Sequence, residues 1–219
     1  KNEAVRSNDE AQVEVELTRG FWLQETQVTQ GMWESVMATT PWKGRQYVKE
    51  GSKVAASFVN WDDAQEFCEK LQASARQSSV LAGSGKIVLP SEARWEYACR
   101  AGTSTTYSFG NDAGTLGEYA WYDGNAWYKD EKYAHEVGLK KANGWGLLDM
   151  HGNVWEWCDD YYDAKLPGGR DPLVHAGSSR VVRGGSFRVV PHSVRCARRF
   201  SDVPADRGNR IGFRVVFES

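Results

Sequence analysis

Cysteines and paired acids are the residues of this sequence best suited to chemistry. The chain contains four cysteines: Cys68, Cys99, Cys158 and Cys196. Their spacing forms no Cys-x-x-Cys motif, so neither a zinc ribbon nor a dithiol redox site is predicted. We interpret Cys68 and Cys158 as small buried apolar groups. The acidic pairs Asp62-Asp63 and Asp159-Asp160 stand at the expected ends of elements and do not indicate an acid–base pair.

A glycine turn and a strip of arginines mark the C-terminal part of the chain. The turn Gly184-Gly185-Ser186 is too short to be a phosphate-binding loop. The strip that follows it consists of Arg195, Arg198, Arg199, Arg207, Arg210 and Arg214. We expect several of these arginines to pair with Asp202, Asp206 or backbone carbonyls. Because the chain has 27 basic and 29 acidic residues, a nucleic-acid partner is not expected.

The bulk composition predicts one loop-rich domain spanning residues 1–219. No linker-like stretch divides the chain, and no apolar run approaches the roughly 18 residues of a membrane span. The first residues lack the apolar stretch of a signal peptide, which leaves the compartment open. Ten Trp, nine Tyr and 22 Gly indicate loops held by large side chains, as in an irregular α+β fold.

Short elements are expected to position the polar residues. Residues 13–17 alternate apolar and acidic side chains, which predicts a strand, and a second strand is expected at residues 21–23. Thr29 is expected to cap a helix through Met37, and Asn60 a helix of about three turns. A loop is expected over residues 72–85. The inward side of the first helix is expected to carry Met32, Trp33 and Val36.

The second half of the chain contains a long stretch without a recognisable pattern. A strand is expected at residues 86–89, followed by a helix that begins at Pro90-Ser91 and turns Trp95, Ala98 and Cys99 inward. Residues 107–171 show almost no periodicity, which in a compact domain indicates a functional or ion-stabilised segment. Strands are expected again at residues 180–183 and 212–217.

Four stretches, taken together and in this order, point to a family. They are Val59–Ala64 with Phe67-Cys68, Leu89–Tyr97, Trp145–Trp157, and Arg183–Phe187 leading to Ile211–Arg214. With this order and spacing, the chain resembles the formylglycine-generating-enzyme and sulfatase-modifying-factor family from about Leu17 to Val216. The resemblance implies that family's irregular, loop-rich α+β fold, which elaborates a C-type-lectin-like core.

The resemblance also shows what this chain lacks. Family members that make formylglycine oxidise a cysteine of a sulfatase with oxygen and copper(I), which two thiolates bind just after the Gly-Gly-Ser turn. Here Val189 occupies the place of the first cysteine, and the second has no counterpart because the segment is shorter. We therefore do not expect copper or the usual oxidation, and no catalytic residue can be assigned.

Other family features are expected to persist. A cysteine pair bonded in some relatives matches Cys99 and Cys196, so these two are a disulfide candidate. A calcium loop of the family matches Gly152, Asn153, Val154 and Glu156, and we expect a structural calcium ion there. A second calcium site would begin at Asn125-Ala126. We do not expect it to form, because the following loop is shorter and Lys129 falls near the place of an acid.

Three functions remain open. The family's peptide cleft matches Trp157 and Ser186, and with Arg188, His192 and Arg195 they form a candidate pocket for an anionic or aromatic ligand. The first reading is a divergent oxidoreductase. The second is a ligand-binding module like the variable proteins of diversity-generating retroelements, whose ligand residues match residues 187–210. The third is an inactive paralogue that regulates an active partner. The peptide or small-molecule ligand and the oligomeric state cannot be read from the sequence.

Overall fold

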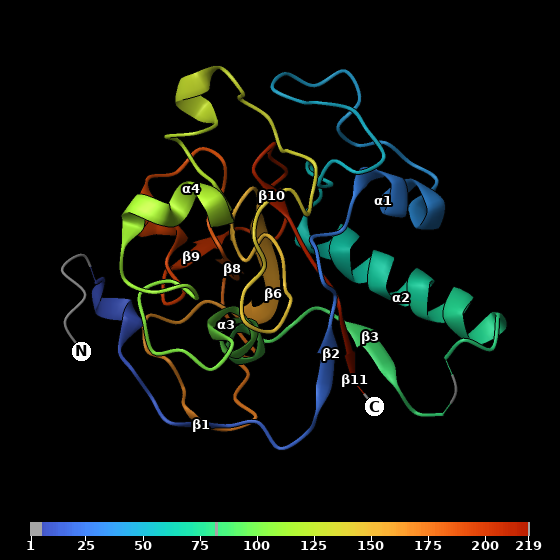
Figure 1. Cartoon of the computed structure of the whole chain (residues 1–219). Coiled ribbons are helices and arrows are strands. Elements are labelled where there is room, and N and C mark those ends of the chain that lie inside the picture. Colours follow the sequence, from blue (N-terminus) through green and yellow to red (C-terminus); the bar gives the residue numbers. More distant parts are fainter. Residues whose placement is uncertain (1–5, 82, 219) are drawn as a thin grey trace.

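A four-stranded sheet runs through the middle of the molecule (Figure 1). In the computed structural model, which describes residues 6–81 and 83–218, its order is β10-β6-β8-β9. The strands are β6 (Trp155–Tyr161), β8 (Arg180–Arg183), β9 (Arg199–Asp202) and β10 (Ile211–Gly212). β6 pairs in parallel with β10 and antiparallel with β8, which pairs antiparallel with β9. The longest of these strands, β6, lies inside the stretch without periodicity because nearly all of its residues are buried, so polar and apolar residues do not alternate.

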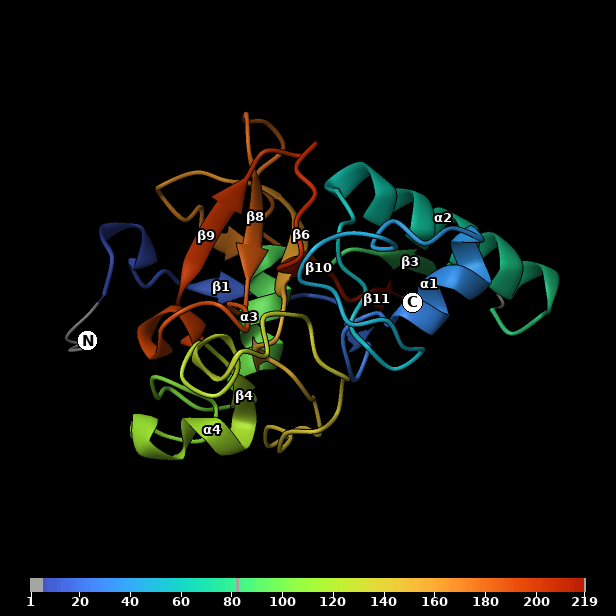
Figure 2. The same ribbon diagram turned by 90° about the horizontal axis from the view of Figure 1, so that it is seen from above.

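A three-stranded antiparallel sheet brings a strand from the last residues of the chain between two strands from its first half. Its order is β2-β11-β3, formed by β2 (Phe21–Leu23), β11 (Val216–Glu218) and β3 (Lys86–Val88). The central strand comes from the end of the chain, with Phe217 facing Trp22 on one side and Ile87 on the other. Seen from above, α1 and α2 lie on the side of this sheet, away from β8 and β9 (Figure 2).

Side-chain caps begin the two helices of this side. Helix α1 (Gln30–Met37) starts where the Thr29 side chain accepts a hydrogen bond from the Met32 backbone, and Asn60 forms a reciprocal capping box with Asp63 at α2 (Trp61–Gln77). The expectation for Met32 was wrong, because this side chain is 43% exposed and Met37 is buried instead. The loop expected from residue 72 was also misplaced. Ala, Gln and Arg favour a helix there, and α2 continues to its end at residue 77.

The third helix packs against the four-stranded sheet. Helix α3 (Glu92–Arg100) begins with Ser91, whose hydroxyl accepts a hydrogen bond from the Arg94 backbone, and it contacts β6 and β8. Trp95, Ala98 and Cys99 are buried, as the helical spacing predicts. On the other side, Trp33, Phe67 and Phe213 form a core cluster, with ring centroids 5.7 Å apart for Trp33–Phe67 and 5.2 Å for Phe67–Phe213.

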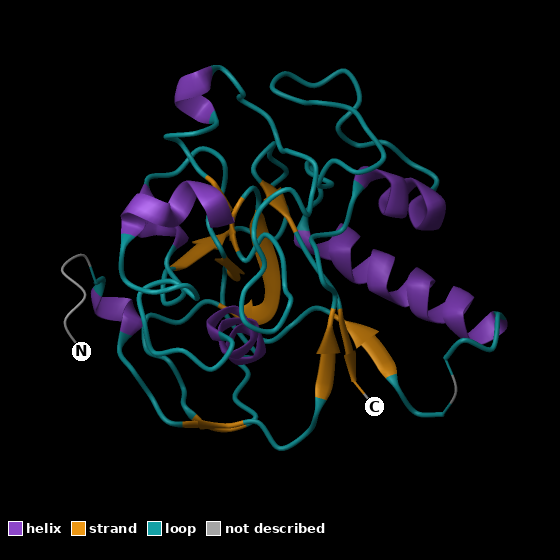
Figure 3. Ribbon diagram, viewed as in Figure 1, coloured by secondary structure: helices purple, strands orange, loops and turns teal. Residues whose placement is uncertain are grey.

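Loops and very short elements make up most of the rest (Figure 3). The short helices are η1 (Asn8–Glu10), η2 (Ala113–Thr115), α4 (Leu116–Tyr119), η3 (Trp127–Lys129) and η4 (Pro191–Val194). The short strands are β1 (Val15–Glu16), β4 (Ala120–Trp121), β5 (His151–Gly152) and β7 (Gly169–Arg170). β1 pairs with β7 and β4 with β5, both in parallel. The irregular, loop-rich α+β fold is confirmed. No helix in the described ranges is long and apolar enough to cross a membrane.

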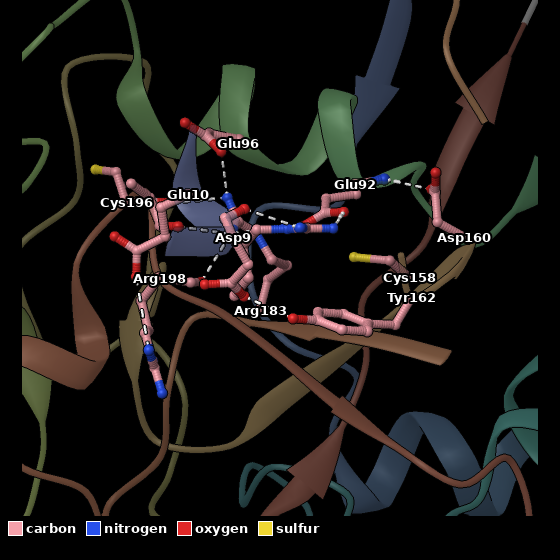
Figure 4. Close-up of polar contacts among 12 residues, drawn as sticks. Asp9, Glu10, Glu92, Glu96, Cys158, Asp160, Tyr162, Arg183, Cys196 and Arg198 are labelled. Carbon is pink, nitrogen blue, oxygen red and sulfur yellow. Dashed lines mark hydrogen bonds and ion pairs between the residues drawn. The ribbon is translucent and has the colours of Figure 1, made fainter. Parts of the chain in front are cut away.

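Buried arginine–glutamate pairs hold the loops together. Arg195 is bound through two nitrogens to Glu10, at 2.9 Å each, and Arg199 to Glu92 at 2.7 and 2.8 Å (Figure 4 shows the glutamates). Three arginines of the strip, Arg195, Arg199 and Arg214, are buried and donate to backbone carbonyls as expected, whereas the expected aspartate partners were largely wrong. Only Arg210 contacts Asp202, at 3.7 Å, among the ion pairs of the described residues. Glutamates from distant segments replace the nearby aspartates because the fold brings η1 and α3 under this strip.

Candidate functional site

Four oxygen atoms from the loop 149–156 converge on one buried nitrogen, the Nε2 of Gln27. The distances are 2.9 Å to Glu156 Oε1, 3.0 Å to the Val154 carbonyl, and 3.3 Å to the carbonyls of Asp149 and Gly152. The loop can turn this tightly because Gly152 has a φ of +87° and lies against Trp121. A Cβ at residue 152 would come within 2.0 Å of the Trp121 carbonyl oxygen. We call this group the Gln27 cage.

The cage contains more acceptors than its donor can satisfy. An amide nitrogen carries two hydrogens, whereas four oxygens lie within hydrogen-bond distance of it. Glu156 is fully buried and is also bound by Arg214, at 2.7 Å from Nε to Oε2 and 2.8 Å from the terminal nitrogen to Oε1. Trp95 donates a further hydrogen bond of 2.6 Å to Glu156 Oε2. The carboxylate charge is therefore balanced by Arg214, while the carbonyl oxygens share one donor.

A carboxylate that sequence reasoning missed lies beside this cage. Asp149, which contributes its carbonyl, is 2% exposed, and its Oδ2 accepts a hydrogen bond of 2.8 Å from the Gly138 backbone. Its Oδ1 has no hydrogen-bond partner among the described residues. Burial raises the pKa of this carboxyl to about 6. The only signal in the sequence is an acid placed three residues before Gly152.

These oxygens form a donor set of the kind that calcium binds. Calcium takes carboxylate and carbonyl oxygens in flexible geometry, and the Gln27 cage offers one carboxylate oxygen and three carbonyl oxygens once the Gln27 amide turns aside. The residues therefore fit this ion. The Asn153 side chain does not belong to the set. It accepts a hydrogen bond of 2.8 Å from the His135 backbone and donates one of 3.0 Å to Gln27.

The residues of the second candidate site do not fit a metal ion. The Asn125 side chain closes its own turn, accepting from the Tyr122 backbone at 2.9 Å and donating to the Ala120 carbonyl at 2.8 Å. The Ala126 carbonyl accepts hydrogen bonds from the backbones of Lys129 and Glu131, at 2.8 and 3.1 Å. The oxygens that an ion would need are thus already used within the loop.

The segment after the Gly-Gly-Ser turn contains no sulfur ligand. Val189 is half-buried and packs against the core residues of two clusters, one around Trp157 and one around Tyr107. Ser186 and Phe187 are fully buried, and the Phe187 backbone donates a hydrogen bond of 2.8 Å to the Asn153 carbonyl. A copper ion at this place would meet an apolar side chain, so these residues do not fit it.

The five residues of the expected pocket are not brought together. Trp157 is fully buried and donates a hydrogen bond of 3.1 Å to the Val59 carbonyl, so it is a core residue. Ser186 is also fully buried, and Arg195 points to Glu10 in the interior. The expectation of a pocket formed by these five residues was therefore wrong, and only Arg188 and His192 reach the surface.

Aromatic side chains that sequence reasoning missed flank this surface. The Arg188 guanidinium lies 4.4 Å from the centroid of the Trp127 ring, and Lys132 lies 5.4 Å from the same ring. The Tyr47 ring is 5.8 Å from the Trp127 ring. We call these four residues the Trp127 face. They come from three separate loops, so no local pattern in the sequence indicates that they meet.

Two of the buried thiols lie next to each other. The sulfur atoms of Cys99 and Cys196 are 3.5 Å apart, in contact but not bonded. His151 lies beside them, with its Nδ1 donating to the Val194 carbonyl at 2.7 Å and its Nε2 accepting from the Ser108 backbone at 3.2 Å. A hydrogen bond from Cys99 lowers the pKa of Cys196 to about 5. Cys158 lies in the same core cluster as this pair and Cys68 in another, and burial raises the pKa of both of these thiols.

Known proteins share both the sequence pattern and this architecture. The model of the "Sulfatase-modifying factor enzyme 1-like domain" matches residues 2–219. The formylglycine-generating enzyme of Mycobacterium tuberculosis is 35% identical over 154 residues, which covers 58% of this chain and 50% of that protein. The mouse "inactive C-alpha-formylglycine-generating enzyme 2" is 29% identical, covering 77% and 51%. The chain thus spans about half the length of these relatives.

A solved structure extends the likeness across nearly the whole fold. Treponema denticola variable protein 1 superposes with a TM-score of 0.80 at 29% identity, covering 92% of this chain and 85% of that one. The family model covers almost every residue. The chain therefore belongs to the sulfatase-modifying-factor family.

Proposed function

We propose that this chain is a ligand-binding member of its family that does not oxidise cysteine to formylglycine. The observation that carries the proposal is Val189, half-buried against core residues at the place where the family's first copper-binding cysteine would stand. Oxidation by that route needs a pair of thiolates, because copper(I) is a soft ion. All four cysteines of this chain are buried, and none of them lies at this face.

The Trp127 face is the proposed binding surface. It combines an indole ring with two cations held against it, at 4.4 and 5.4 Å, and it adjoins the segment 187–210. Rings offer stacking partners, and cations held nearby attract negative charge. An acidic, aromatic peptide is therefore the ligand class that this face suits. The likeness to a variable protein over 92% of the chain supports the use of this segment for binding.

A binding experiment tests this surface. A fluorescein-labelled peptide with alternating Glu and Phe residues is titrated into the protein, and its anisotropy is followed. Arg188→Ala and Trp127→Ala are expected to weaken binding at least tenfold, whereas Trp22→Ala serves as a matched control because Trp22 is 75% exposed on β2. Equal affinity of all variants contradicts the assignment of the Trp127 face.

Calcium is the proposed structural ion of the Gln27 cage. The support comes from the four converging oxygens, and from the buried Asp149 carboxylate of the same segment, whose Oδ1 has no partner among the described residues. When bound, the ion would supply charge that ties the loop 149–156 to Gln27, without a part in any reaction. Thermal unfolding with calcium and with a chelator tests the site. We expect calcium to raise the unfolding midpoint of the wild type and to leave the midpoint of Asp149→Ala unchanged. A wild-type midpoint that is the same with calcium and with the chelator contradicts the calcium site.

Regulation of an active enzyme is a second candidate function. It is favoured by the 29% identity to the mouse protein whose name marks it as inactive. The experiment adds the chain to an active formylglycine-generating enzyme and measures the initial rate of peptide oxidation. A rate of peptide oxidation that changes with the concentration of this chain supports regulation. A constant rate contradicts it and leaves ligand binding as the proposed function.

A further inference from the structure

A cavity of about 1030 Å³ lies between residues 10–23 and helix α3. In Figure 1 the segment with β1 passes beneath α3, at the end of the molecule away from η3, which carries Trp127. We call residues 10–20 the strap. No residue of the Trp127 face lines this cavity. The space is of the size that binds small molecules in other proteins, about 300–1,000 Å³.

The strap turns its apolar side toward this space. Val13, Val15 and Leu17 line the cavity, whereas Glu14 and Glu16 between them do not. Val13 and Val15 remain 36% and 38% exposed. An alternating strand normally buries its apolar face against a core. Here the apolar side of the strap lines a cavity, so no core residues cover it.

The fold holds the strap in this position at several points. At its start, Glu10 forms two hydrogen bonds of 2.9 Å with Arg195. In its middle, the backbones of Gly169 and Asp171 donate to the carbonyls of Glu14 and Glu16, at 2.8 Å each. Residue 168 must be glycine-like, because its φ is +61° and a Cβ would lie 3.1 Å from the Glu14 oxygen. The cavity is thus fixed by specific bonds rather than left by a loose loop.

Aromatic rings form part of the opposite wall. Tyr97 of α3 is 53% exposed and Trp145 is 49% exposed, although both line the cavity. Their ring centroids are 4.9 Å apart at 60°, and Phe21 continues the row at 6.4 Å from Tyr97. Such rings present flat apolar surface at little cost in conformational entropy. This wall suits a ligand with a planar, apolar body.

Three of the carboxylates that line the cavity are paired with arginines. Glu10 is paired with Arg195, and Glu92 with Arg199 at 2.7 Å. Glu96 points to Arg183 and is also paired with Arg100 at 2.8 Å (Figure 4 shows Glu96 beside Arg183). Arg6 and Arg19 also line the cavity but are exposed to solvent, where water screens their charge. Asp160 also lines the cavity, and its two carboxylate oxygens accept hydrogen bonds from the backbones of Glu92 and Val174, at 2.7 and 3.1 Å. An anionic ligand would therefore find no unpaired buried cation among the described lining residues.

We propose that this cavity binds a neutral small molecule with a flat, apolar ring system. Its ring would stack on Tyr97 and Trp145 and cover the apolar side of the strap at Val13 and Val15. The proposal does not depend on the Trp127 face, which lies elsewhere. It adds a second binding site of different chemistry to the same chain.

A pair of matched probes tests the proposal. N-phenyl-1-naphthylamine is neutral and fluoresces in apolar surroundings, and 1-anilinonaphthalene-8-sulfonate has the same rings with one negative charge. We expect saturable binding of one neutral probe per chain, with at least tenfold weaker binding of the charged one. Tyr97→Ala and Val15→Glu should each weaken binding of the neutral probe at least tenfold. Tyr128→Ala, which removes a ring that is 73% exposed and does not line the cavity, should leave this binding unchanged.

The outcomes separate the site from a general loss of structure. Tyr97 and Val15 are exposed, so both variants should keep the wild-type unfolding midpoint, which is measured in parallel. No saturable signal from the neutral probe would overturn the proposal. So would equal binding by Tyr97→Ala and Tyr128→Ala, or tighter binding of the sulfonate.

Discussion

The Gln27 cage and the segment after the Gly-Gly-Ser turn are neighbours that differ in what they keep of the family's chemistry. They are tied together by the Gly152 backbone, which donates to the Gly184 carbonyl at 2.8 Å. In the cage every oxygen is buried and Glu156 has partners on three sides. In the segment, Val189 is half-buried where the proposed function places a lost cysteine, and Arg188 is exposed.

The difference teaches where this fold can change. A buried carboxylate among fixed donors cannot be replaced without leaving charges and hydrogen bonds unpaired. An exposed loop position has no such constraint, because water satisfies whatever the chain leaves open. The scaffold can therefore persist while its surface chemistry changes.

The largest expected effect comes from opening the cage. Glu156→Ala leaves Arg214 buried without its carboxylate and removes acceptors from Gln27 and Trp95. We expect the free energy of unfolding to fall by about 3–5 kcal/mol, as for other broken buried pairs. Urea denaturation measures it, with Glu14→Ala as an exposed control expected to stay within about 0.5 kcal/mol. A loss below about 1 kcal/mol for Glu156→Ala would show that the cage does not hold the scaffold.

The buried thiols sharpen the contrast, because the chain keeps a cysteine pair in its interior instead of at the face. With sulfurs 3.5 Å apart, Cys99 and Cys196 are expected to close a disulfide when the protein is treated with oxidised glutathione. The bond should raise the free energy of unfolding by about 2–4 kcal/mol. Thiol titration after unfolding should then find two free cysteines in the wild type. Three free thiols in oxidised Cys99→Ser would agree, and four in the oxidised wild type would not.

A third effect depends on pH and concerns the floor beneath α3. Burial, with smaller contributions from Glu92 and Asp159, raises the pKa of Asp160 to about 6, against an ordinary value of 3.8. The folded state therefore binds a proton that the unfolded state lacks between about pH 4 and 6, so this group lowers stability as pH rises through that window. From pH 7 to pH 5 the wild type should gain about 1 kcal/mol more than Asp160→Asn. Parallel slopes of the two unfolding curves against pH would contradict this.

The smallest expected effect is at the exposed face. Arg188 lies over the Trp127 ring in solvent, so Arg188→Ala should change the free energy of unfolding by no more than about 0.5 kcal/mol. Arg195→Ala, seven residues on, is the matched comparison. It leaves the buried Glu10 with only Arg198, at 3.6 Å, in place of two hydrogen bonds of 2.9 Å, and we expect a loss of several kcal/mol. Equal losses for the two arginines would remove the distinction between scaffold and surface.

Local patterns predicted helices α1, α2 and α3 and strands β2, β3 and β8, but not strands β4, β5, β7 and β9 or the long-range contacts. The caps at Thr29, Asn60 and Ser91 mark the helix starts because a side chain and a backbone three residues away suffice to form them. Strand β6 was not predicted, because burial on both of its faces removes the alternation of polar and apolar residues.

The candidate site was harder to predict than the fold. The motif around Glu156 indicated an oxygen-rich loop, but Asp149 and Gln27 could not be placed in it. Gln27 reaches the loop from 129 residues away from Glu156, through the folded core. Arg195 looked like a pocket residue because its partner Glu10 is 185 residues distant. Side chains that meet only through tertiary contacts leave no periodic signal in the sequence.

Mass spectrometry of a sulfatase-type Cys-x-Pro-x-Arg peptide tests the central claim most directly. The peptide is incubated aerobically with this protein and copper(I), beside an active formylglycine-generating enzyme as a control. If Val189 marks a lost oxidation site, the peptide keeps its thiol with this protein and becomes an aldehyde only in the control. Conversion of the cysteine by this protein would contradict the account and would require a copper site elsewhere in the chain.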